Sequence, residues 1–212
     1  MSQVAREIPW PAPRLAREED GALMDADDDD RGILAEIRRG EMGRFDVFVD
    51  RHKTRLFRFL YMRSGNRDVA EDLTQDVFVK VMGSGGPEAG TANAGGRVCT
   101  WLFAIARNRL ADHYRAQQRS KRAYGWLLRL TPRDSTLDPA TIAGFEEERA
   151  RVAGWLAALP EEQREVLSLR VYGDLSLGEI AEITEGPLAT VKSRLRYGLG
   201  KIGTMLAKET HP

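Results

Sequence analysis

Hydrophobic residues repeat at helical spacing along most of the chain from Ile33 onward. Steps of three and four place apolar side chains on one face of a helix, whereas a strand would show strict alternation. We find no segment with strand alternation and no internal repeat, so the pattern predicts an all-α fold. The expected buried faces comprise Phe45, Phe48, Val49, His52, Leu56, Phe59 and Leu60; Ala70, Leu73, Val77 and Val81; Trp101, Leu102, Ile105 and Ala106; and Ile142, Phe145, Val152, Leu156 and Leu159.

Residues 159–206 predict a helix-turn-helix. Pro160 suits the first helical position because its missing N–H would be unpaired there in any case. A break at 173–174 ends that helix near Tyr172, and Ser176-x-x-Glu179 is a capping box that opens a second, short helix. The sequence Glu185-Gly186-Pro187 makes a sharp turn, so a third helix is expected to begin at Pro187.

The third helix has one apolar and one polar face. Its outward face combines short polar side chains with cations, and residues 186–208 contain no acid. That pattern favours entry into the DNA major groove, although an ordinary solvated surface helix is the alternative. We expect Leu188, Val191, Leu195, Leu199, Ile202 and Leu206 to be buried, and Ala189, Thr190, Ser193, Arg196 and Tyr197, flanked by Lys192 and Arg194, to face outward.

Two earlier helices have polar faces of opposite character. The helix over 68–82, expected to be capped by Asp68 and Glu71, turns an acidic-polar patch outward, which suits a basic protein surface or water rather than DNA. The helix from Trp101 onward interleaves cations with amide and aromatic groups, as single-stranded nucleic acid requires, unless it is only a solvated basic helix end. These faces consist of Asp72, Gln75, Asp76 and Val79 in the first helix, and Asn108, Arg109, Asp112, His113, Tyr114, Arg115 and Arg119 in the second.

Charge is strongly segregated although the 212-residue chain has no net charge. Residues 97–133 carry nine basic and one acidic side chain, and residues 134–165 carry three basic and eight acidic ones. Two cationic blocks, 97–133 and 186–208, separated by an acidic connector suggest two contacts on one polyanion. Residues 1–32, with the run Asp27–Asp30, are expected to form a disordered acidic extension that is simply solvated, shields the basic blocks or binds a partner.

The composition excludes several classes of protein. No apolar run is long enough to span a bilayer and no secretory signal is present, so we expect a cytoplasmic protein without membrane insertion. One cysteine, Cys99, and three scattered histidines form neither a disulfide nor a zinc pattern, and Cys99 and His113 are expected to be packing residues. No nucleophile–base constellation supports an enzyme, and no cofactor motif is present.

Three segments together resemble the extracytoplasmic-function sigma factors of bacterial RNA polymerase: DVAEDLTQDVFVKVM, WLFAIARNRLADHYR and LPEEQREVLSLRVYGDLSLGEIAEITEGPLATVKSRLR. The resemblance covers about residues 33–120 and 140–208. It implies two small helical domains, sigma region 2 over 33–122 and the helix-turn-helix of region 4 over 140–208, joined by a flexible linker at 123–139. It further implies a non-enzymatic factor that binds core polymerase and is controlled by an anti-sigma factor.

The resemblance also implies roles for individual residues. The beta-prime coiled coil of core polymerase would be contacted by Asp72, Gln75, Asp76 and Val79. The beta subunit of the polymerase is expected as a second partner. Trp101, Asn108, Arg109, Asp112, Arg115 and Arg119 would bind the melted −10 element, with loop 83–96 receiving a flipped base. Ala189, Thr190, Lys192, Ser193, Arg194, Arg196 and Tyr197 would read the −35 duplex.

This chain departs from the family pattern at a few positions. Loop 83–96 is long, with six glycines in fourteen positions. Gly198 and Gly200 lie inside the recognition helix, where each would cost about 1 kcal/mol against alanine, so we expect the end of this helix to fray. A sigma-like decoy that binds only an anti-sigma protein is the alternative function, and the strongly basic block 97–133 argues against it.

Overall fold

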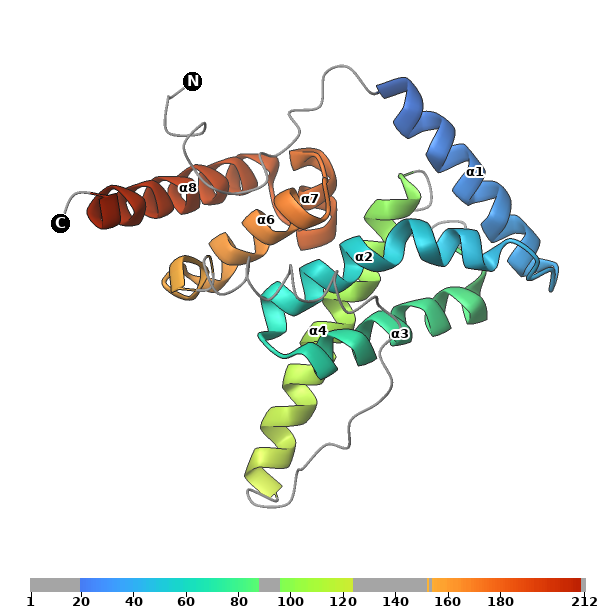
Figure 1. The fold of residues 1–212 in the computed structure, drawn as a ribbon, viewed down its shortest axis with the longest axis horizontal. Coiled ribbons are helices and arrows are strands. Elements are labelled where there is room, and N and C mark those ends of the chain that lie inside the picture. The colour runs from blue at the N-terminus through green and yellow to red at the C-terminus, as the bar shows by residue number, and fades with distance from the viewer. Residues whose placement is uncertain (1–19, 88–95, 124–151, 153, 211–212) are drawn as a thin grey trace.

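The computed structural model describes residues 20–87, 96–123, 152 and 154–210, and every regular element in these ranges is an α-helix (Figure 1). The all-α prediction is therefore confirmed for the described part of the chain. The helices are α1 (Asp20–Arg38), α2 (Phe45–Ser64), α3 (Arg67–Ser84), α4 (Val98–Ala123), α6 (Glu161–Tyr172), α7 (Leu177–Thr184) and α8 (Leu188–Thr210).

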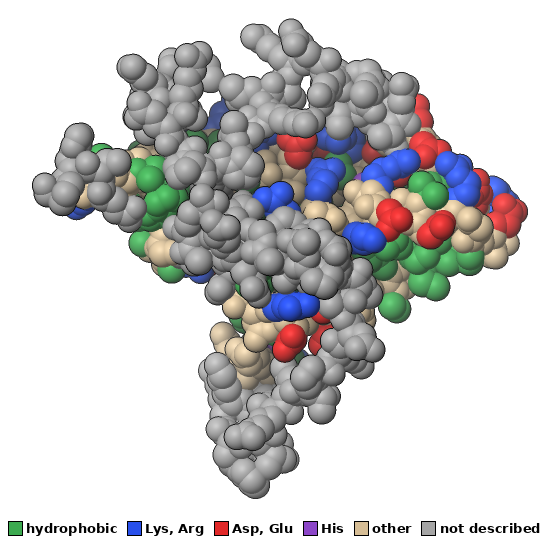
Figure 2. All heavy atoms as spheres, in the orientation of Figure 1, with side chains coloured by type: hydrophobic (Ala, Val, Ile, Leu, Met, Phe, Trp, Pro, Cys, Tyr) green, Lys and Arg blue, Asp and Glu red, His purple; other side chains and the backbone are tan. Residues whose placement is uncertain are grey.

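Helix α1 contains the acidic run and is attached to the helices that follow it. The carboxylate of Asp30 is almost fully buried and accepts hydrogen bonds from Arg51 and His52, the latter at 2.7 Å. Asp29 pairs with Arg44 and Arg51, and these two guanidinium groups lower the pKa of its carboxyl. Figure 2 shows acidic and basic side chains interleaved over this end of the molecule, where α1 meets α2. The expectation of disorder through residue 32 is thus wrong for residues 20–32, which belong to α1, and arginines of α2 and of the turn before it neutralise Asp29 and Asp30.

Asp27 provides a cap for a distant helix. Its Oδ1 accepts a hydrogen bond from the backbone N–H of Val98 at 2.6 Å, at the first residue of α4. Helix α4 has no acidic residue in its first turn, so α1 supplies the negative charge that a helix N-terminus favours. Arg31, paired with Asp27 at 3.0 Å, donates to the carbonyl of Gly96 just before the same helix.

Helices α2, α3 and α4 pack around an aromatic and aliphatic core. Phe48, Leu56, Phe57 and Leu60 are fully buried, and three of these four are predicted from their spacing. The start of α3 differs from the sequence prediction. Its cap is Asn66, whose side chain accepts from Val69 N–H at 3.1 Å, and Glu71 instead pairs with Arg67 at 2.9 Å. An Asn cap one residue before the helix replaces the expected Asp68–Glu71 box.

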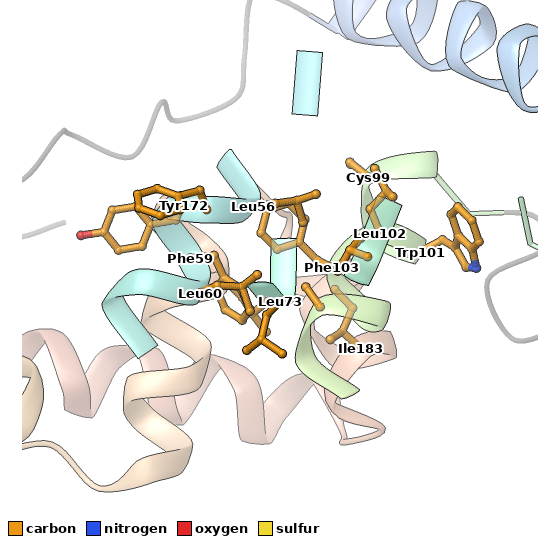
Figure 3. Close-up of a cluster of buried hydrophobic side chains, with 14 of the residues drawn as sticks. Leu56, Phe59, Leu60, Leu73, Cys99, Trp101, Leu102, Phe103, Tyr172 and Ile183 are labelled. Atoms are coloured by element: carbon orange, nitrogen blue, oxygen red, sulfur yellow. The ribbon is translucent and has the colours of Figure 1, made fainter. Parts of the chain in front are cut away.

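Helices α6, α7 and α8 form a second group that packs directly on the first. Helix α6 lies against α2, and α7 lies against α4. One continuous cluster of buried side chains runs through both groups, and Figure 3 shows Tyr172 and Ile183 in it together with Phe59 and Phe103. The two helical groups predicted from sequence are present and share one core. The expected linker at 123–139 lies almost wholly outside the described residues.

Candidate nucleic-acid and protein-binding surfaces

The helix-turn-helix is formed as the local sequence predicts. Ser176 accepts from Glu179 N–H at 3.2 Å while Glu179 Oε2 accepts from Ser176 N–H at 2.7 Å, so both halves of the capping box are present. Glu185 ends α7 in the left-handed conformation, with φ of 53°. Pro160 is the residue before α6 rather than its first helical residue, and α8 begins at Leu188, one position after the expected start.

The outward face of α8 is open to solvent along its first three turns. Ala189, Lys192, Arg196 and Tyr197 are exposed, and Thr190, Ser193 and Arg194 are half-exposed. The Arg196 guanidinium lies over the Tyr197 ring at 5.0 Å, which presents a cation and an aromatic face together. The Ser193 hydroxyl donates to the Thr190 carbonyl at 3.0 Å and keeps its lone pairs for another donor. All seven predicted residues lie on this accessible side of the helix.

The buried stripe of α8 differs from the expected one at two positions. Val191 and Ile202 are fully buried, and Leu195 and Leu206 pack partly against the core. Leu188 and Leu199 are wrong as buried residues, because they are 42% and 36% exposed. Gly198 takes the inward place next to Leu199, and a Cβ there would lie 2.7 Å from Leu167 Cδ1. The glycine thus permits close approach of α8 to α6.

Helix α4 presents its polar residues at two different depths. Asn108, Asp112, Arg115 and Arg119 are exposed and Arg109 is half-buried. Arg115 donates to the Asp112 carboxylate at 2.6 Å. From its position in the sequence, Asp112 could pair with either Arg109 or Arg115. Trp101, by contrast, is only 9% exposed and packs in the core, so in this conformation little of its ring is open to a nucleobase.

Two aromatic candidates on α4 are also held in place. The Tyr114 hydroxyl donates to the backbone carbonyl of Arg63 at 3.0 Å, and burial raises the pKa of this phenol. His113 is half-buried and lies edge-on to the Tyr114 ring at 5.7 Å between centroids. The Tyr114 contact therefore helps to fix α4 against α2. Cys99 is buried in the core, as expected, and burial raises the pKa of its thiol to about 11.

Helix α3 carries an exposed stripe with both acidic and apolar members. Val77 and Val81 are fully buried, whereas Asp76 is exposed and Val79 is 65% exposed. Asp72 and Gln75 are half-exposed on the same side. The sequence prediction missed Met82, which is 48% exposed and follows Val79 at helical spacing. The signal that could have identified Met82 is its place three residues after Val79. Met82 extends the exposed stripe by one turn.

The described residues offer little for metal binding or membrane insertion. No group of three or more His, Cys, Asp or Glu side chains among them is placed to hold a metal ion. In the same part of the chain, no helix is long and apolar enough to cross a bilayer.

Comparison with known proteins identifies the two helical groups. Residues 48–120 match the family model for sigma-70 region 2, and residues 150–202 match the model for sigma-70 region 4. The ECF RNA polymerase sigma factor SigK of Mycobacterium ulcerans is 31% identical over 175 residues, which cover 81% of this chain and 90% of that protein. The ECF sigma factor BldN of Streptomyces coelicolor is 29% identical over 190 residues, covering 84% and 68% of the two chains.

Solved structures share the fold. CnrH, determined in complex with the cytosolic domain of CnrY, matches with a TM-score of 0.60 at 22% identity, over 85% of this chain and 99% of CnrH. RpoE from Bartonella quintana, determined with the anti-sigma factor NepR, matches with a TM-score of 0.58 at 24% identity, over 77% and 96% of the two chains. The chain belongs to the extracytoplasmic-function family of RNA polymerase sigma factors.

Proposed function

We propose that this protein is a non-enzymatic promoter-specificity subunit that binds core RNA polymerase and directs it to promoters with its own −35 and −10 elements. The observation that carries the proposal is the exposed, acid-free face of α8 on a fully formed helix-turn-helix. Major-groove reading requires short polar side chains at base edges and cations at the flanking phosphates. The first three turns of α8 offer both.

Within α8 the side chains divide into two roles. Thr190 and Ser193 are short and lie near the start of the helix, where recognition helices contact bases, so we assign base reading to them with Ala189. Lys192, Arg194 and Arg196 are assigned to phosphates, with the Tyr197 ring alongside Arg196. Phosphate contacts position the helix and carry most of the salt dependence, whereas base contacts set the preferred sequence.

Helix α4 is assigned to the −10 element. Flipping a base costs a few kcal/mol, and stacking of about 1–3 kcal/mol per base together with phosphate contacts can offset that cost. Asn108 and Asp112 would contact unpaired bases, and Arg109, Arg115 and Arg119 would contact phosphates. Trp101 would join them only if the start of α4 rearranges, because its ring is 9% exposed here.

The stripe on α3 is assigned to core polymerase. Asp72, Gln75, Asp76 and Val79, extended by Met82, combine acids with exposed apolar side chains. A basic helical surface such as the beta-prime coiled coil would meet both the charge and the apolar area, and the beta subunit would complete the contact with the enzyme. We place region 2 at residues 33–122 and region 4 at 140–208, with α1 as an added part of region 2.

An anti-sigma factor is the proposed regulator. Support comes from the two structural neighbours, since one was determined with the anti-sigma factor NepR and the other with the cytosolic domain of CnrY. We further propose that the protein acts in the cytoplasm, where the polymerase and the promoter are.

Run-off transcription tests the proposed function. Core polymerase, with and without this protein, is given a library of randomised promoters, and the transcribed templates are sequenced. We expect transcription only with the protein present, and two selected elements at a fixed spacing. Exchange of Ser193 should alter the upstream element alone. No protein-dependent transcript from any template, with a control sigma factor active on the same core, would overturn the proposal.

A further inference from the structure

One row of side chains on α1 reaches both ends of loop 83–96. The row consists of Asp27, Arg31, Leu34 and Arg38, whose steps of four, three and four residues place them on the same side of the helix. We call it the α1 row. Figure 1 shows α1 passing the end of α3, where the loop begins, and the start of α4, where it ends. The structure describes residues 83–87 and 96–97 of this loop.

The leading end of the loop packs against Arg38. Gly85 ends α3 with φ of 62°, Gly86 follows with φ of 116°, and both glycines are buried. A Cβ on Gly85 would overlap Arg38 Cγ, and a Cβ on Gly86 would lie 3.2 Å from Leu34 Cδ1. The Arg38 guanidinium donates to the Pro87 carbonyl at 3.3 Å. The two glycines therefore let the chain leave α3 in direct contact with α1, because they tolerate positive φ and have no side chain.

The trailing end of the loop is held by the other half of the row. Arg31 donates to the Gly96 carbonyl and pairs with Asp27 at 3.0 Å. Asp27 in turn accepts from Val98 N–H at 2.6 Å. At both ends the hydrogen-bonding partners of the row are backbone groups, as the Pro87 carbonyl is. Contacts of this kind fix the path of the chain without constraining its side chains.

The two attachments lie on one rigid element. Residues 27 and 38 are eleven positions apart, which is about 16 Å along an α-helix at 1.5 Å per residue. Helix α1 is itself anchored to α2 through Asp30, whose buried carboxylate accepts from Arg51 and His52. The same row caps α4, to which we assign the −10 element. Helix α1 therefore fixes the separation of the two loop ends and ties both to the start of the −10 helix.

Resting on the proposed function, we propose that the α1 row is a clamp that sets the base preference at the −10 element, with Arg31 and Arg38 as its positioning residues. Neither side chain has to touch DNA. Holding both ends restricts the conformations open to the segment between them. A base then binds at a lower cost in conformational entropy, and the base that fits the fixed arrangement is favoured. Release of one end should weaken discrimination at the −10 element and leave the −35 element unaffected.

Two alanine variants release one end each, and a third serves as the matched control. Arg38→Ala frees the leading end, Arg31→Ala frees the trailing end, and Arg39→Ala makes the same change at the next residue, which is exposed and pairs with Glu41 at 3.0 Å. Each full-length variant, with core polymerase, transcribes one library with the −10 element randomised and another with the −35 element randomised. Hydrogen exchange of the free proteins, measured by mass spectrometry over 85–87 and 96–98, reports on the clamp itself.

We expect Arg38→Ala and Arg31→Ala to reduce the preference for the favoured base at one −10 position about threefold to tenfold, with the −35 preference unchanged. Exchange should rise at 85–87 in Arg38→Ala and at 96–98 in Arg31→Ala. Arg38→Lys keeps Cγ beside Gly85 and a donor for the Pro87 carbonyl, so it should restore most of the preference. A wild-type −10 preference in both alanine variants would overturn the clamp. An equal change in Arg39→Ala, or an equal change at the −35 element, would overturn it as well.

Failure of the proposed function would give a different result. If the wild-type protein gave no transcript while exchange rose in Arg38→Ala and Arg31→Ala but not in Arg39→Ala, the assigned function would fail while the clamp itself stood. If the wild-type protein directed transcription and all three alanine variants showed its exchange profile, the clamp would fail and the assigned function would stand.

Discussion

Gly198 and Gly200, two of the three glycines in α8, are expected to respond in opposite ways to replacement by alanine. A Cβ added at Gly200 would meet no other group within 4 Å, and this residue is exposed, so Gly200→Ala should stabilise the protein by about 0.5–1 kcal/mol through backbone entropy. At Gly198 the added Cβ would lie 2.7 Å from Leu167 Cδ1 and 3.6 Å from Gln163 Cβ. Leu167 is 1% exposed, so its side chain has little room to move.

The magnitude for Gly198→Ala follows from two opposing effects. Overpacking in a tight core costs about 1–3 kcal/mol, and the helix-propensity gain of about 1 kcal/mol offsets part of it. We expect a net loss of about 1 kcal/mol, and hence a difference of about 2 kcal/mol between the two variants. For a chain of this size 1 kcal/mol corresponds to about 2–4 °C in Tm.

Urea denaturation followed by circular dichroism, with Tm from thermal melts, measures both variants against the wild-type protein. Gly200→Ala serves as the control for helix propensity, since it makes the same chemical change two residues away on the open side. If Gly198→Ala stabilised the protein as much as Gly200→Ala, the close approach of α8 to α6 would be refuted. The −35 duplex affinity should follow the same order, because α8 is seated through Gly198.

Four further outcomes are expected. Asp76→Arg should reduce capture of core polymerase by at least about tenfold without loss of helicity, since it places a cation against a basic partner. Asn108→Ala should leave the closed promoter complex nearly intact and reduce permanganate reactivity of −10 thymines, because duplex DNA hides the base edges that this side chain would contact. Asp27→Ala should destabilise the protein by about 1 kcal/mol in urea melts, because the N-terminus of α4 loses its cap. Cys99 should react with iodoacetamide at pH 8 about a hundredfold more slowly than in urea, since its pKa rises from 9.0 to about 11 and the thiolate fraction falls accordingly.

Each of these outcomes has a control. Asp27→Asn keeps an acceptor for Val98 N–H and should recover part of the lost stability. A pre-melted bubble template should restore some activity to Asn108→Ala; equal losses on duplex and bubble would make Asn108 a packing residue. Undiminished capture of polymerase by Asp76→Arg would remove α3 from the polymerase surface. A Cys99 alkylation rate equal to that in urea would contradict its burial.

Local sequence signals predict the helices well because their causes are local. The capping box at Ser176 and Glu179 forms in both directions as predicted, since its partners lie three residues apart. Most of the inward faces of α2 and α3 also follow from spacing, although Phe45 and Val49 are only partly buried and the buried Phe57 and Phe78 are not predicted. The error at α3, where Asn66 rather than Asp68 is the cap, is a competition between two nearby polar side chains that only the backbone geometry resolves.

The remaining features depend on contacts between distant segments. Asp27 meets Val98 N–H across 71 positions, and no local pattern distinguishes that carboxylate from a solvated acid in a charged tail. By helix propensity alone Gly198 is a weak point of α8, because propensity counts only its own helix. Gly198 instead stabilises the packing of α8 on α6, because the Leu167 side chain of α6 occupies the space that a Cβ at residue 198 would need.

The charge segregation of the chain takes on a second meaning in the structure. From sequence, the cationic blocks 97–133 and 186–208 suggest two contacts on a polyanion, separated by the acidic block 134–165. In the structure Arg107 of the first cationic block pairs with Glu165 of the acidic block at 2.9 Å, so the acidic block is not only a spacer but neutralises part of the surface that would attract DNA.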